Sequence, residues 1–338
     1  MVEQHVNKRK FLSRSFFKIL ILVGVLLLLA NHTEIAKAVR ETKYIKRTNN
    51  RSDGDTRPKE TKYYGKDYES DYIKTKYIMH KLFNENGQKF SAKQRANLVK
   101  ERCQTFLKEN NLRLNPNTKC RYDREFMRSR SYNLTICYNC KVASTNTKRV
   151  LYVLDHNFTG DINSLTVHTV GEYGRKCMNN FQEIMSEKHR ISVMFVREPL
   201  ERLLSAYRER RAYRKHFRDP SFSLKNYLQL ILDEQMKNIN RHMYPYFERC
   251  RPCEMQYDFI GLQHHFNDDI KAVLQDIGAS GKVDIPTRNE TGYTSESSDN
   301  LLKLYFSKVP NDIIHKLWKK YYKDYYIFGF PYPSHLMN

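Results

Sequence analysis

Two short polar segments carry side chains that could bind anions. The first, residues 141–149, reads KVASTNTKR and combines a lysine with consecutive hydroxyl and amide side chains. If a helix begins within it, the free backbone N–H groups and the positive end of the helix dipole would favour an anion, with the Lys141 ammonium as a mobile charge. The GxxxxGK[ST] pattern is absent, which argues against a nucleoside-triphosphate kinase. The alternative interpretation is an ordinary helix capped by Ser or Thr.

The second segment, residues 197–211, reads REPLERLLSAYRERR and begins with an arginine. An arginine suits phosphate binding because its planar guanidinium is always charged and can donate two parallel hydrogen bonds. Arg197 is therefore a candidate for anion binding, with Arg202 near the start of the following helix and Ser205 two helical turns further on. The alternative interpretation is a basic helix face that is simply exposed to water.

An apolar run that predicts a buried strand precedes each segment. Residues 134–138 (LTICY) lead into the first segment, and residues 191–196 (ISVMFV) lead into the second. Apolar residues at helical spacing follow both turns, and Pro199 suits the first turn of a helix because its missing N–H costs nothing there. Strand, polar turn and helix, occurring twice, predict an α/β fold with a parallel sheet flanked by helices. Both turns would then lie at the carboxyl ends of the strands, where such sheets bind ligands.

The start of the 338-residue chain predicts a membrane anchor. Residues 16–30 form an apolar run broken only by Lys18, and basic residues precede it. This pattern is typical of a single-pass type II signal-anchor, with residues 1–15 as a cytoplasmic tail and everything after the anchor in the lumen. The alternative is a signal peptide cleaved at the A-x-A pattern of residues 36–38.

The rest of the chain divides into a linker and one domain. Residues 31–90 are polar, without sustained apolar periodicity, and predict a lumenal stalk. Residues 91–338 predict a single folded domain, because no internal repeat is visible and the length suits one α/β domain. Ser91 can cap the first helix of this domain, whose apolar residues recur at helical spacing.

The charge balance indicates a polyanionic partner. Lys and Arg number 59 against 37 Asp and Glu, a formal net charge of +22. Aromatic residues at 13% exclude a mostly disordered chain. A lumenal location argues against nucleic acid and favours acidic glycans as the partner.

Two further features agree with a secretory location. N-x-S/T glycosylation sequons begin at Asn31, Asn50, Asn133, Asn157 and Asn289. The seven cysteines permit disulfides in an oxidising compartment, and their odd number leaves at least one thiol unpaired within the chain. The pair Cys250-x-x-Cys253 could bind zinc, but no second pair has suitable spacing, so a disulfide role with unassigned partners is favoured.

The two anion-binding segments resemble those of sulfotransferases that use 3′-phosphoadenosine 5′-phosphosulfate (PAPS). More closely, the chain is similar to the Golgi carbohydrate sulfotransferases related to chondroitin 4-O-sulfotransferase and the natural-killer-epitope sulfotransferase. Their PKVACTNWKR appears here as CKVASTNTKR from Cys140, and their FVRDPFERLVSAFR as FVREPLERLLSAYR from Phe195. Further similar segments are HMYP at 242–245, CRPC at 250–253, YDFIGL at 257–262 and YYKDYYIFGF at 321–330. The resemblance runs from Cys103 to Tyr332.

The resemblance implies a P-loop-like sulfotransferase fold for residues 91–338 and a role for each segment. It places Lys141 at the bridging oxygen of the donor, with the rest of the first turn around the 5′-phosphosulfate. It places Arg197 and Ser205 at the 3′-phosphate. The full set of donor-binding residues expected is Lys141, Val142, Ala143, Ser144, Thr145, Asn146, Thr147, Arg197, Arg202 and Ser205.

The acceptor hydroxyl needs a general base, and histidine suits because its protonation changes near lumenal pH. His168 lies between the two phosphate segments, where related heparan-type enzymes have a catalytic histidine, and His242 begins the HMYP segment. For each, the alternative is a hydrogen-bonded structural histidine. The expected catalytic residues are therefore Lys141, His168 and His242, with no metal required.

The resulting functional prediction is a Golgi carbohydrate O-sulfotransferase that acts on position 4 of N-acetylgalactosamine in chondroitin or on a related glycosaminoglycan. The alternatives are a membrane-anchored, non-catalytic binder of acidic glycans and a metal-dependent glycosyltransferase. Departures from the family pattern fall nearer the acceptor side, at Cys140, Thr147, Met243 and Leu262. They affect the prediction of the acceptor rather than that of the donor.

Overall fold

The computed structural model describes residues 90–114, 125–129, 131–176, 178–179, 181–187, 190–213, 222–234, 242–286 and 298–337. All of these residues fall in the second of two units into which the chain divides, 1–80 and 81–338. The predicted cytoplasmic tail, signal-anchor and stalk lie outside the described residues, apart from residue 90, and stay predictions. None of the helices described is both long and apolar enough to cross a membrane.

A mixed sheet with the strand order β3-β1-β2-β4-β5 forms the centre of the domain. Its strands are β1 (Phe126–Arg128), β2 (Leu134–Cys137), β3 (Met178–Asn179), β4 (Ile191–Val196) and β5 (Phe259–Leu262). The neighbours β2, β4 and β5 are parallel, whereas β1 is antiparallel to both β2 and β3. The α/β class is therefore confirmed, but the expectation of an entirely parallel sheet is wrong at the β1–β3 edge. The physical reason is that β1 and β2 are joined by residues 129–133, too few for the crossover that parallel neighbours require.

The register of the parallel strands brings the two anion-binding segments together. Leu134 of β2 pairs with Ile191 of β4, and Cys137 pairs with Met194. The two strands therefore end at the same edge of the sheet, so the turns that follow them start side by side. The predicted strand at residues 191–196 has the bounds of β4, while β2 ends one residue before the predicted limit.

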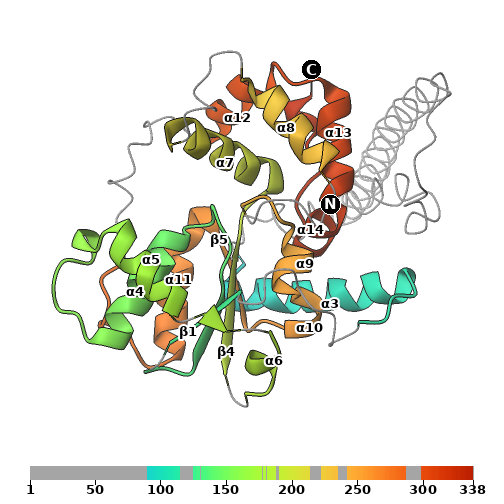
Figure 1. The fold of residues 1–338 in the computed structure, drawn as a ribbon. Coiled ribbons are helices and arrows are strands. Elements are labelled where there is room, and N and C mark those ends of the chain that lie inside the picture. Colours follow the sequence, from blue (N-terminus) through green and yellow to red (C-terminus); the bar gives the residue numbers. More distant parts are fainter. Residues whose placement is uncertain are drawn as a thin grey trace, which may run out of the picture. The chain divides into compact units, whose positions relative to one another are not determined.

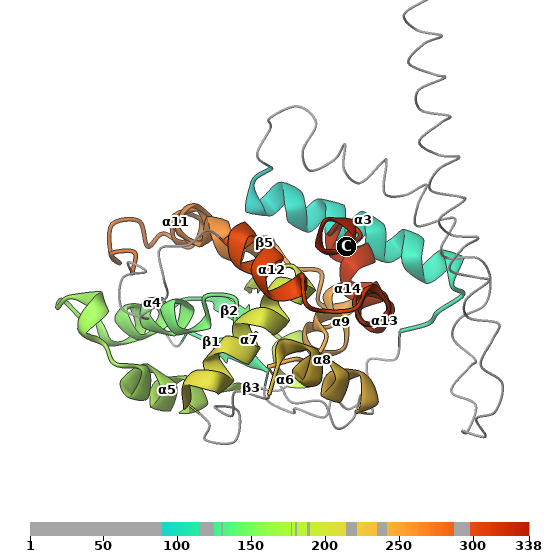
Figure 2. The same ribbon diagram turned by 90° about the horizontal axis from the view of Figure 1, so that it is seen from above.

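Helices cover both faces of the sheet (Figure 1). One face carries α4 (Ser144–His156), α5 (Val167–Lys176) and α11 (Phe266–Asp276). The other carries α3 (Ala92–Glu109), α9 (Tyr246–Cys250) and α10 (Pro252–Met255). Seen from above in Figure 2, α4 and α3 lie on opposite sides of the strands.

A further group of helices lies beyond the carboxyl ends of the strands, above the sheet in Figure 1. It contains α7 (Pro199–Tyr213), α8 (Leu224–Asp233), α12 (Ser298–Phe306) and α13 (Asn311–Lys320). The remaining short elements are α6 (Phe181–Met185), α14 (Tyr322–Phe328) and the 3-10 helices η1 (Ile162–Ser164), η4 (Gln263–His265) and η5 (Ser334–Leu336).

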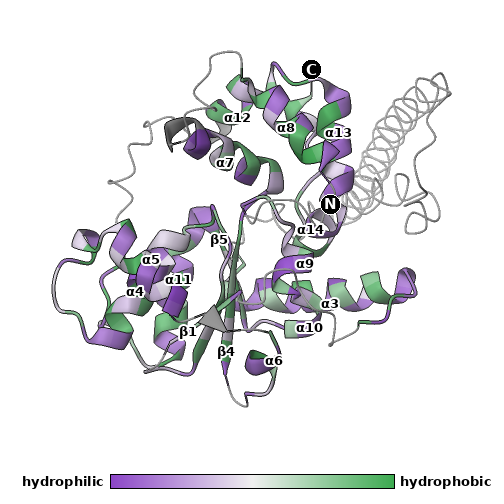
Figure 3. Ribbon diagram, viewed as in Figure 1, coloured by the Kyte–Doolittle hydropathy of each residue, from purple (hydrophilic) through white to green (hydrophobic). Residues whose placement is uncertain are grey.

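The first described helix, α3, begins where the sequence predicts. Ser91 accepts a hydrogen bond from the Gln94 backbone N–H at 3.3 Å, and the Gln94 side chain accepts one from the Ser91 N–H at 2.8 Å. This reciprocal capping box satisfies two of the N–H groups that a helix start leaves free. Hydrophobic and hydrophilic residues alternate in bands along α3 (Figure 3), because one face packs on β5 while the other meets solvent.

Two disulfides stabilise the helical layer of α3, α9 and α10, one within the layer and one between it and the sheet. Cys103 of α3 is bonded to Cys253 of α10, and Cys137 of β2 is bonded to Cys250 of α9. The disulfide interpretation of the CRPC segment is therefore confirmed, and its two cysteines bond to other elements rather than to each other. Cys140 is a buried free thiol, and the remaining two cysteines lie outside the described residues.

Candidate active site

A cavity of about 840 Å³ opens at the carboxyl ends of the parallel strands. Its wall is built by the turn after β2, the start of α4, the cavity-facing side of α7, part of α5, and the segment that follows β5. Seven of the residues predicted to bind the donor line it: Lys141, Ala143, Ser144, Thr145, Asn146, Arg197 and Ser205. Residues from both anion-binding segments therefore share one crevice.

The turn after β2 is not a side-chain-capped helix start. The N-cap residue of α4 is Ala143, which makes no side-chain cap hydrogen bond. Lys141 and Ala143 both have left-handed backbone conformations, with φ of 70° and 63°. Such conformations cost roughly 1 kcal/mol or more for residues other than glycine and are concentrated at binding sites. The ordinary capped-helix alternative is therefore wrong, and the first N–H groups of α4 remain available to an anion.

Lys141 extends from this turn toward α7. Its side chain is 11% exposed, and its Nζ lies 3.4 Å from Oε1 of Glu209. Glu209 also lies 3.4 Å, through Oε2, from Nδ1 of His242. Burial opposes ionisation of this carboxyl, but the His242 imidazole and the Lys141 ammonium outweigh it and lower the pKa of Glu209 to about 2. A carboxylate thus stands between the predicted catalytic lysine and one of the two predicted bases.

The turn after β4 holds Arg197 by its backbone and its side chain. The Tyr246 hydroxyl accepts a hydrogen bond from the Arg197 N–H and donates one to its carbonyl, both at 3.1 Å. The Arg197 Nε donates to Glu201 at 2.9 Å, an i,i+4 pair at the start of α7. This pair uses only one nitrogen of the guanidinium fork. Ser205 lies one further turn along the same face and also lines the cavity.

Arg202 lies elsewhere, and its expected role in donor binding is corrected. Its side chain is fully buried, donates from Nη2 to the Tyr244 carbonyl at 3.0 Å, and stacks 4.0 Å from the centre of the Tyr246 ring. Helical periodicity is the reason, because Glu201 and Ser205 share the cavity face of α7 while residue 202 faces the interior. The basic-face alternative also fails at this position, since this arginine is not exposed to water.

Two residues of the first turn are likewise buried rather than on the cavity wall. Val142 is 2% exposed and Thr147 is 3% exposed. The Thr147 hydroxyl donates to the Ala143 carbonyl at 3.2 Å, so it serves the first turn of α4. Their side chains therefore pack behind the turn, so a contact with the donor would have to come from their backbone groups, and their expected part in donor binding stays a prediction.

The two candidate bases occupy different places. His242 is 26% exposed and lines the cavity. His168 lies on α5 with an exposed side chain and is not among the lining residues, although Val167 and Gly171 of the same helix are. The structure thus brings His242 together with Lys141 and places His168 outside the crevice.

Sequence reasoning missed the segment after β5. Gln263, His264 and His265 line the cavity, together with Asn267 and Asp268. Partial desolvation and the neighbouring His265 lower the pKa of His264 from its ordinary value. The signal was present, because the apolar run at 259–262 is followed at once by two histidines and forms a third strand that ends at the same edge. Recognising that run as a strand would have located this wall.

The comparisons with known proteins cover the same part of the chain. Residues 124–331 match the model of the sulfotransferase family. Carbohydrate sulfotransferase 14 of Danio rerio is 30% identical over 226 residues, which cover 59% of this chain and 60% of that protein. Its counterpart in Mus musculus is 29% identical over 237 residues, covering 62% and 61%. Carbohydrate sulfotransferase 10 of Xenopus laevis is 29% identical over 250 residues, covering 63% and 69%.

The chain thus matches about 60% of the length of carbohydrate sulfotransferase 14. No solved structure gives a significant match to the chain. The matched region contains both anion-binding turns, the whole sheet and the segment after β5, so it includes most of the crevice described above. The resemblance seen in the motifs is confirmed: the chain belongs to the sulfotransferase family.

Proposed function

We propose that this protein is a carbohydrate O-sulfotransferase, which moves a sulfo group from PAPS to a hydroxyl of a glycan. One observation carries the proposal: Lys141 from the turn after β2 and Arg197 with Ser205 from the β4–α7 unit line the same cavity. A nucleotide with phosphate groups at both ends requires two separate anion sites facing one crevice. The family membership adds the class of reaction.

The donor would lie across the two turns. The free N–H groups at the start of α4, with the Ser144 and Thr145 hydroxyls, favour the 5′-phosphosulfate, because a helix start attracts anions. Arg197 and Ser205 would bind the 3′-phosphate, the arginine by charge-assisted hydrogen bonds. Lys141 would stand at the bridging oxygen, where negative charge develops as the sulfo group leaves.

The acceptor hydroxyl would attack the sulfur in line with the leaving phosphate oxygen. As in phosphoryl transfer, the protein contributes positioning and charge stabilisation. We assign the base to His242, because it lines the cavity with Lys141, and keep His168 as the alternative to be tested. The transfer requires no metal, so activity should survive a chelator, which would stop a metal-dependent glycosyltransferase.

The acceptor we propose is an acidic glycan, with position 4 of N-acetylgalactosamine in chondroitin as the first candidate. The net charge of +22 favours an acidic substrate. Lys148, Arg175 and Arg208 add cations to the cavity wall beyond those assigned to the donor. The relatives whose names read carbohydrate sulfotransferase support the general class of acceptor.

We also propose that the protein is a single-pass type II protein of the Golgi membrane with its folded domain in the lumen. The two disulfides support an oxidising compartment. Expression of the full chain with a C-terminal tag tests this directly. Protease protection of the tag in sealed vesicles and co-migration with Golgi markers are expected, and a tag exposed to cytosol would contradict it.

The experiment that tests the function is incubation of the full chain with sulfur-labelled PAPS and a panel of desulfated glycosaminoglycans. Digestion to disaccharides then identifies the modified sugar and position. Transfer by the wild type and none by Lys141→Ala supports the proposal. Binding of glycan without transfer by the wild type would instead support the non-catalytic binder.

A further inference from the structure

Glu209 of α7 lies between two residues of the proposed reaction centre. Its Oε1 is 3.4 Å from Nζ of Lys141, and its Oε2 is 3.4 Å from Nδ1 of His242. All three side chains line the cavity, and that of Glu209 is 35% exposed. These contacts connect the turn after β2, the cavity face of α7 and the segment before α9 through one carboxyl group.

The contact with His242 fixes which ring nitrogen can act. An ionised carboxylate only accepts hydrogen bonds, so the nitrogen facing it must carry a proton. A neutral imidazole has one N–H and one nitrogen with a free lone pair. With the proton on Nδ1, the lone pair is on Nε2, which is the nitrogen that can take a proton from another group.

We propose that Glu209 is a positioning residue for sulfo transfer, which holds His242 as the Nδ1–H tautomer so that Nε2 is the base, and which orients the Lys141 ammonium at the same time. This inference rests on the proposed function. Nothing in the motif pattern singled out Glu209, because it lies four residues after Ser205 in what reads as an ordinary charged helix.

The electrostatics of the site support the role. The Glu209 carboxyl stays ionised throughout the range in which the protein would work, since its pKa is lowered to about 2. When His242 takes up a proton, the resulting imidazolium faces the Glu209 carboxylate, which offsets the repulsion from the nearby Lys141 ammonium. The arrangement follows the logic of a carboxylate–histidine pair, in which the carboxylate orients the ring and stabilises its charged form.

The proposed sulfo transfer is a single displacement, in which one bond to sulfur forms as another breaks. The acceptor oxygen forms a bond to sulfur while the bond between sulfur and the bridging oxygen of PAPS breaks. The proton of the acceptor hydroxyl passes to Nε2 of His242, and the electron pair of the broken bond stays on the 5′-phosphate, next to Lys141. Glu209 forms and breaks no covalent bond in this step.

The kinetic test uses the full chain and the variants Glu209→Gln, Glu209→Ala and His242→Gln. We expect kcat to fall about 10- to 100-fold in both Glu209 variants. This is less than the full effect of a general base, because His242 is still present but no longer held in place. Affinity for 3′-phosphoadenosine 5′-phosphate should change less than threefold, because Glu209 contacts neither proposed phosphate site except through Lys141. Glu172→Gln is the matched control, since Glu172 is an exposed carboxylate on α5 that pairs with Lys176 outside the cavity lining.

A double variant separates positioning from a general structural effect. If Glu209 acts through His242, the double variant Glu209→Gln with His242→Gln should have nearly the same kcat as His242→Gln alone. Any further fall in kcat then measures the effect of losing the contact between Glu209 and Lys141. Full additivity of the two losses would overturn the inference. So would an unchanged kcat in both Glu209 variants while Lys141→Ala is inactive, an outcome that leaves the proposed function intact.

A spectroscopic readout tests the tautomer without reference to turnover. Nitrogen-15 labelling of histidine in the full chain, with His242→Gln to identify the signal, reports which ring nitrogen carries the proton at alkaline pH. We expect the Nδ1–H form in the wild type and a shift toward the Nε2–H form in Glu209→Ala. A wild type already in the Nε2–H form overturns the inference. If the wild type transfers no sulfate, the proposed function fails together with this role in transfer, whatever the tautomer.

Discussion

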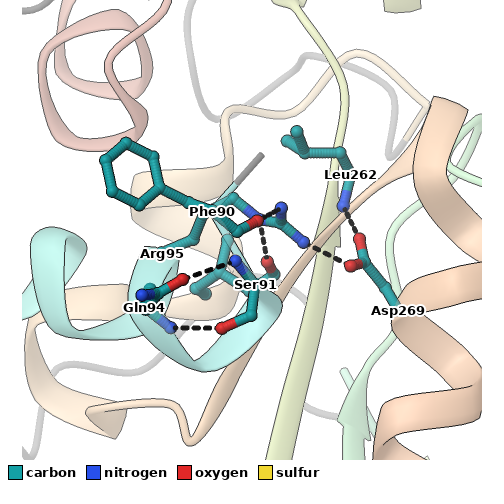
Figure 4. Close-up of polar contacts among 7 residues, drawn as sticks. Phe90, Ser91, Gln94, Arg95, Leu262 and Asp269 are labelled. Carbon is teal, nitrogen blue, oxygen red and sulfur yellow. Dashed lines mark hydrogen bonds and ion pairs between the residues drawn. The ribbon is translucent and has the colours of Figure 1, made fainter. Parts of the chain in front are cut away.

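Arg95 and Asp269 form a buried ion pair that joins α3 to α11 across 174 positions of sequence (Figure 4). Their side chains are only 5% and 8% exposed. Arg95 also donates from Nε to the Ile260 carbonyl of β5 at 2.7 Å, and Asp269 accepts the Leu262 N–H at 2.8 Å. The pair therefore fixes the end of β5, from which the cavity wall at residues 263–268 departs.

Breaking this pair should destabilise the domain strongly. Arg95→Ala leaves the Asp269 carboxylate buried without its cation, and losing one partner of such a pair costs about 3–5 kcal/mol. Chemical denaturation followed by tyrosine and tryptophan fluorescence measures the change in the free energy of unfolding. Lys93→Ala is the matched control, because Lys93 lies on the same helix in an ion pair with Asp276 but is 57% exposed. The control should lose less than about 1 kcal/mol, and equal losses in the two variants would contradict the argument.

The disulfides predict a marked dependence of stability on the redox state. Replacing Cys103 and Cys253 together by serine removes a cross-link between residues 150 positions apart, and loss of a native disulfide typically costs about 2–5 kcal/mol. We expect a lower midpoint of thermal unfolding in this double variant, and a larger fall in the wild type after reduction, because reduction also opens the Cys137–Cys250 disulfide. Peptide mapping under non-reducing conditions checks the pairing. A Cys250–Cys253 peptide would contradict it.

Local signals were sufficient to predict the part of the fold that carries the two turns. Strand β4 is a continuous apolar run that ends at Arg197, and Pro199 marks the first turn of the next helix. Strand β2 and helix α4 could be predicted from the same kind of local pattern. These elements are predictable because the strands are buried on both faces, which makes them mostly apolar, and because each turn is strongly polar.

Other parts of the site depend on tertiary contacts that no local pattern contains. Arg202 belongs to the same motif as Arg197, yet its side chain stacks on Tyr246, which comes from a distant segment. Glu209 gains its place only because α7 lies over the turn of Lys141. Strand β1 is short and includes a polar residue, so its antiparallel pairing could not be read from hydrophobicity. In each of these examples the neighbours in the folded structure, not the residue type, determine the role of the residue or strand.

The stability of the domain should depend on pH through Glu198. Burial and the neighbouring Glu201 carboxylate raise the pKa of Glu198 from 4.5 to about 7. Because the folded state binds this proton more tightly than the unfolded state, its contribution to stability is full below pH 4.5 and is lost as the pH rises to about 7. The loss is about 3 to 4 kcal/mol, because the pKa rises from 4.5 to about 7 and one pKa unit corresponds to about 1.4 kcal/mol.

Glu198→Gln should remove the part of this dependence that is due to Glu198, because glutamine mimics the neutral acid, while the buried Asp324 carboxyl, whose pKa is also raised to about 7, keeps its own part. The glutamine amide can still accept the Glu201 N–H and donate to the Tyr325 oxygen, the two groups that contact the Glu198 carboxyl in the native protein. Unfolding free energies measured between pH 4.5 and 8 in both proteins give the comparison. A wild-type stability that increases steadily over this range, with the variant parallel to it, would refute the prediction.

The two charged residues of the donor site should differ in what their loss affects. Arg197→Ala removes a charge-assisted contact to the 3′-phosphate, worth about 1.5–3 kcal/mol, and should weaken nucleotide binding about 10- to 100-fold. Lys141→Ala should keep much of that affinity but lower kcat by about 100-fold or more, because the lysine acts where charge develops in the transition state. Calorimetric titration with 3′-phosphoadenosine 5′-phosphate and turnover assays separate the two effects. Arg128→Ala, on β1 and outside the cavity lining, is the control, and unchanged binding by Arg197→Ala would count against the assignment.

Substitution of Gly174 on α5 would move the Lys148 ammonium, one of the cations of the cavity wall, without removing it. The Lys148 side chain runs past Gly174, so that its Nζ lies 4.4 Å from the centre of the Tyr138 ring and donates to the Tyr138 hydroxyl at 3.3 Å. A Cβ added at Gly174 would lie 2.9 Å from Cε of Lys148 and 3.1 Å from its Cδ. The lysine must therefore shift, and since it is a flexible side chain the shift costs little.

Gly174→Ala should accordingly keep or slightly raise stability, because alanine is favoured over glycine in a helix by about 1 kcal/mol. Anion binding in the cavity should nevertheless weaken, about threefold to tenfold, which corresponds to roughly 0.6–1.4 kcal/mol. Gly171→Ala is the matched control on the same helix, since Gly171 also lines the cavity but an added Cβ there meets nothing within 4 Å. Nucleotide and glycan titrations of both variants, with thermal unfolding in parallel, complete the test. Equal binding by the two variants would show that the position of the Lys148 ammonium does not matter to the site.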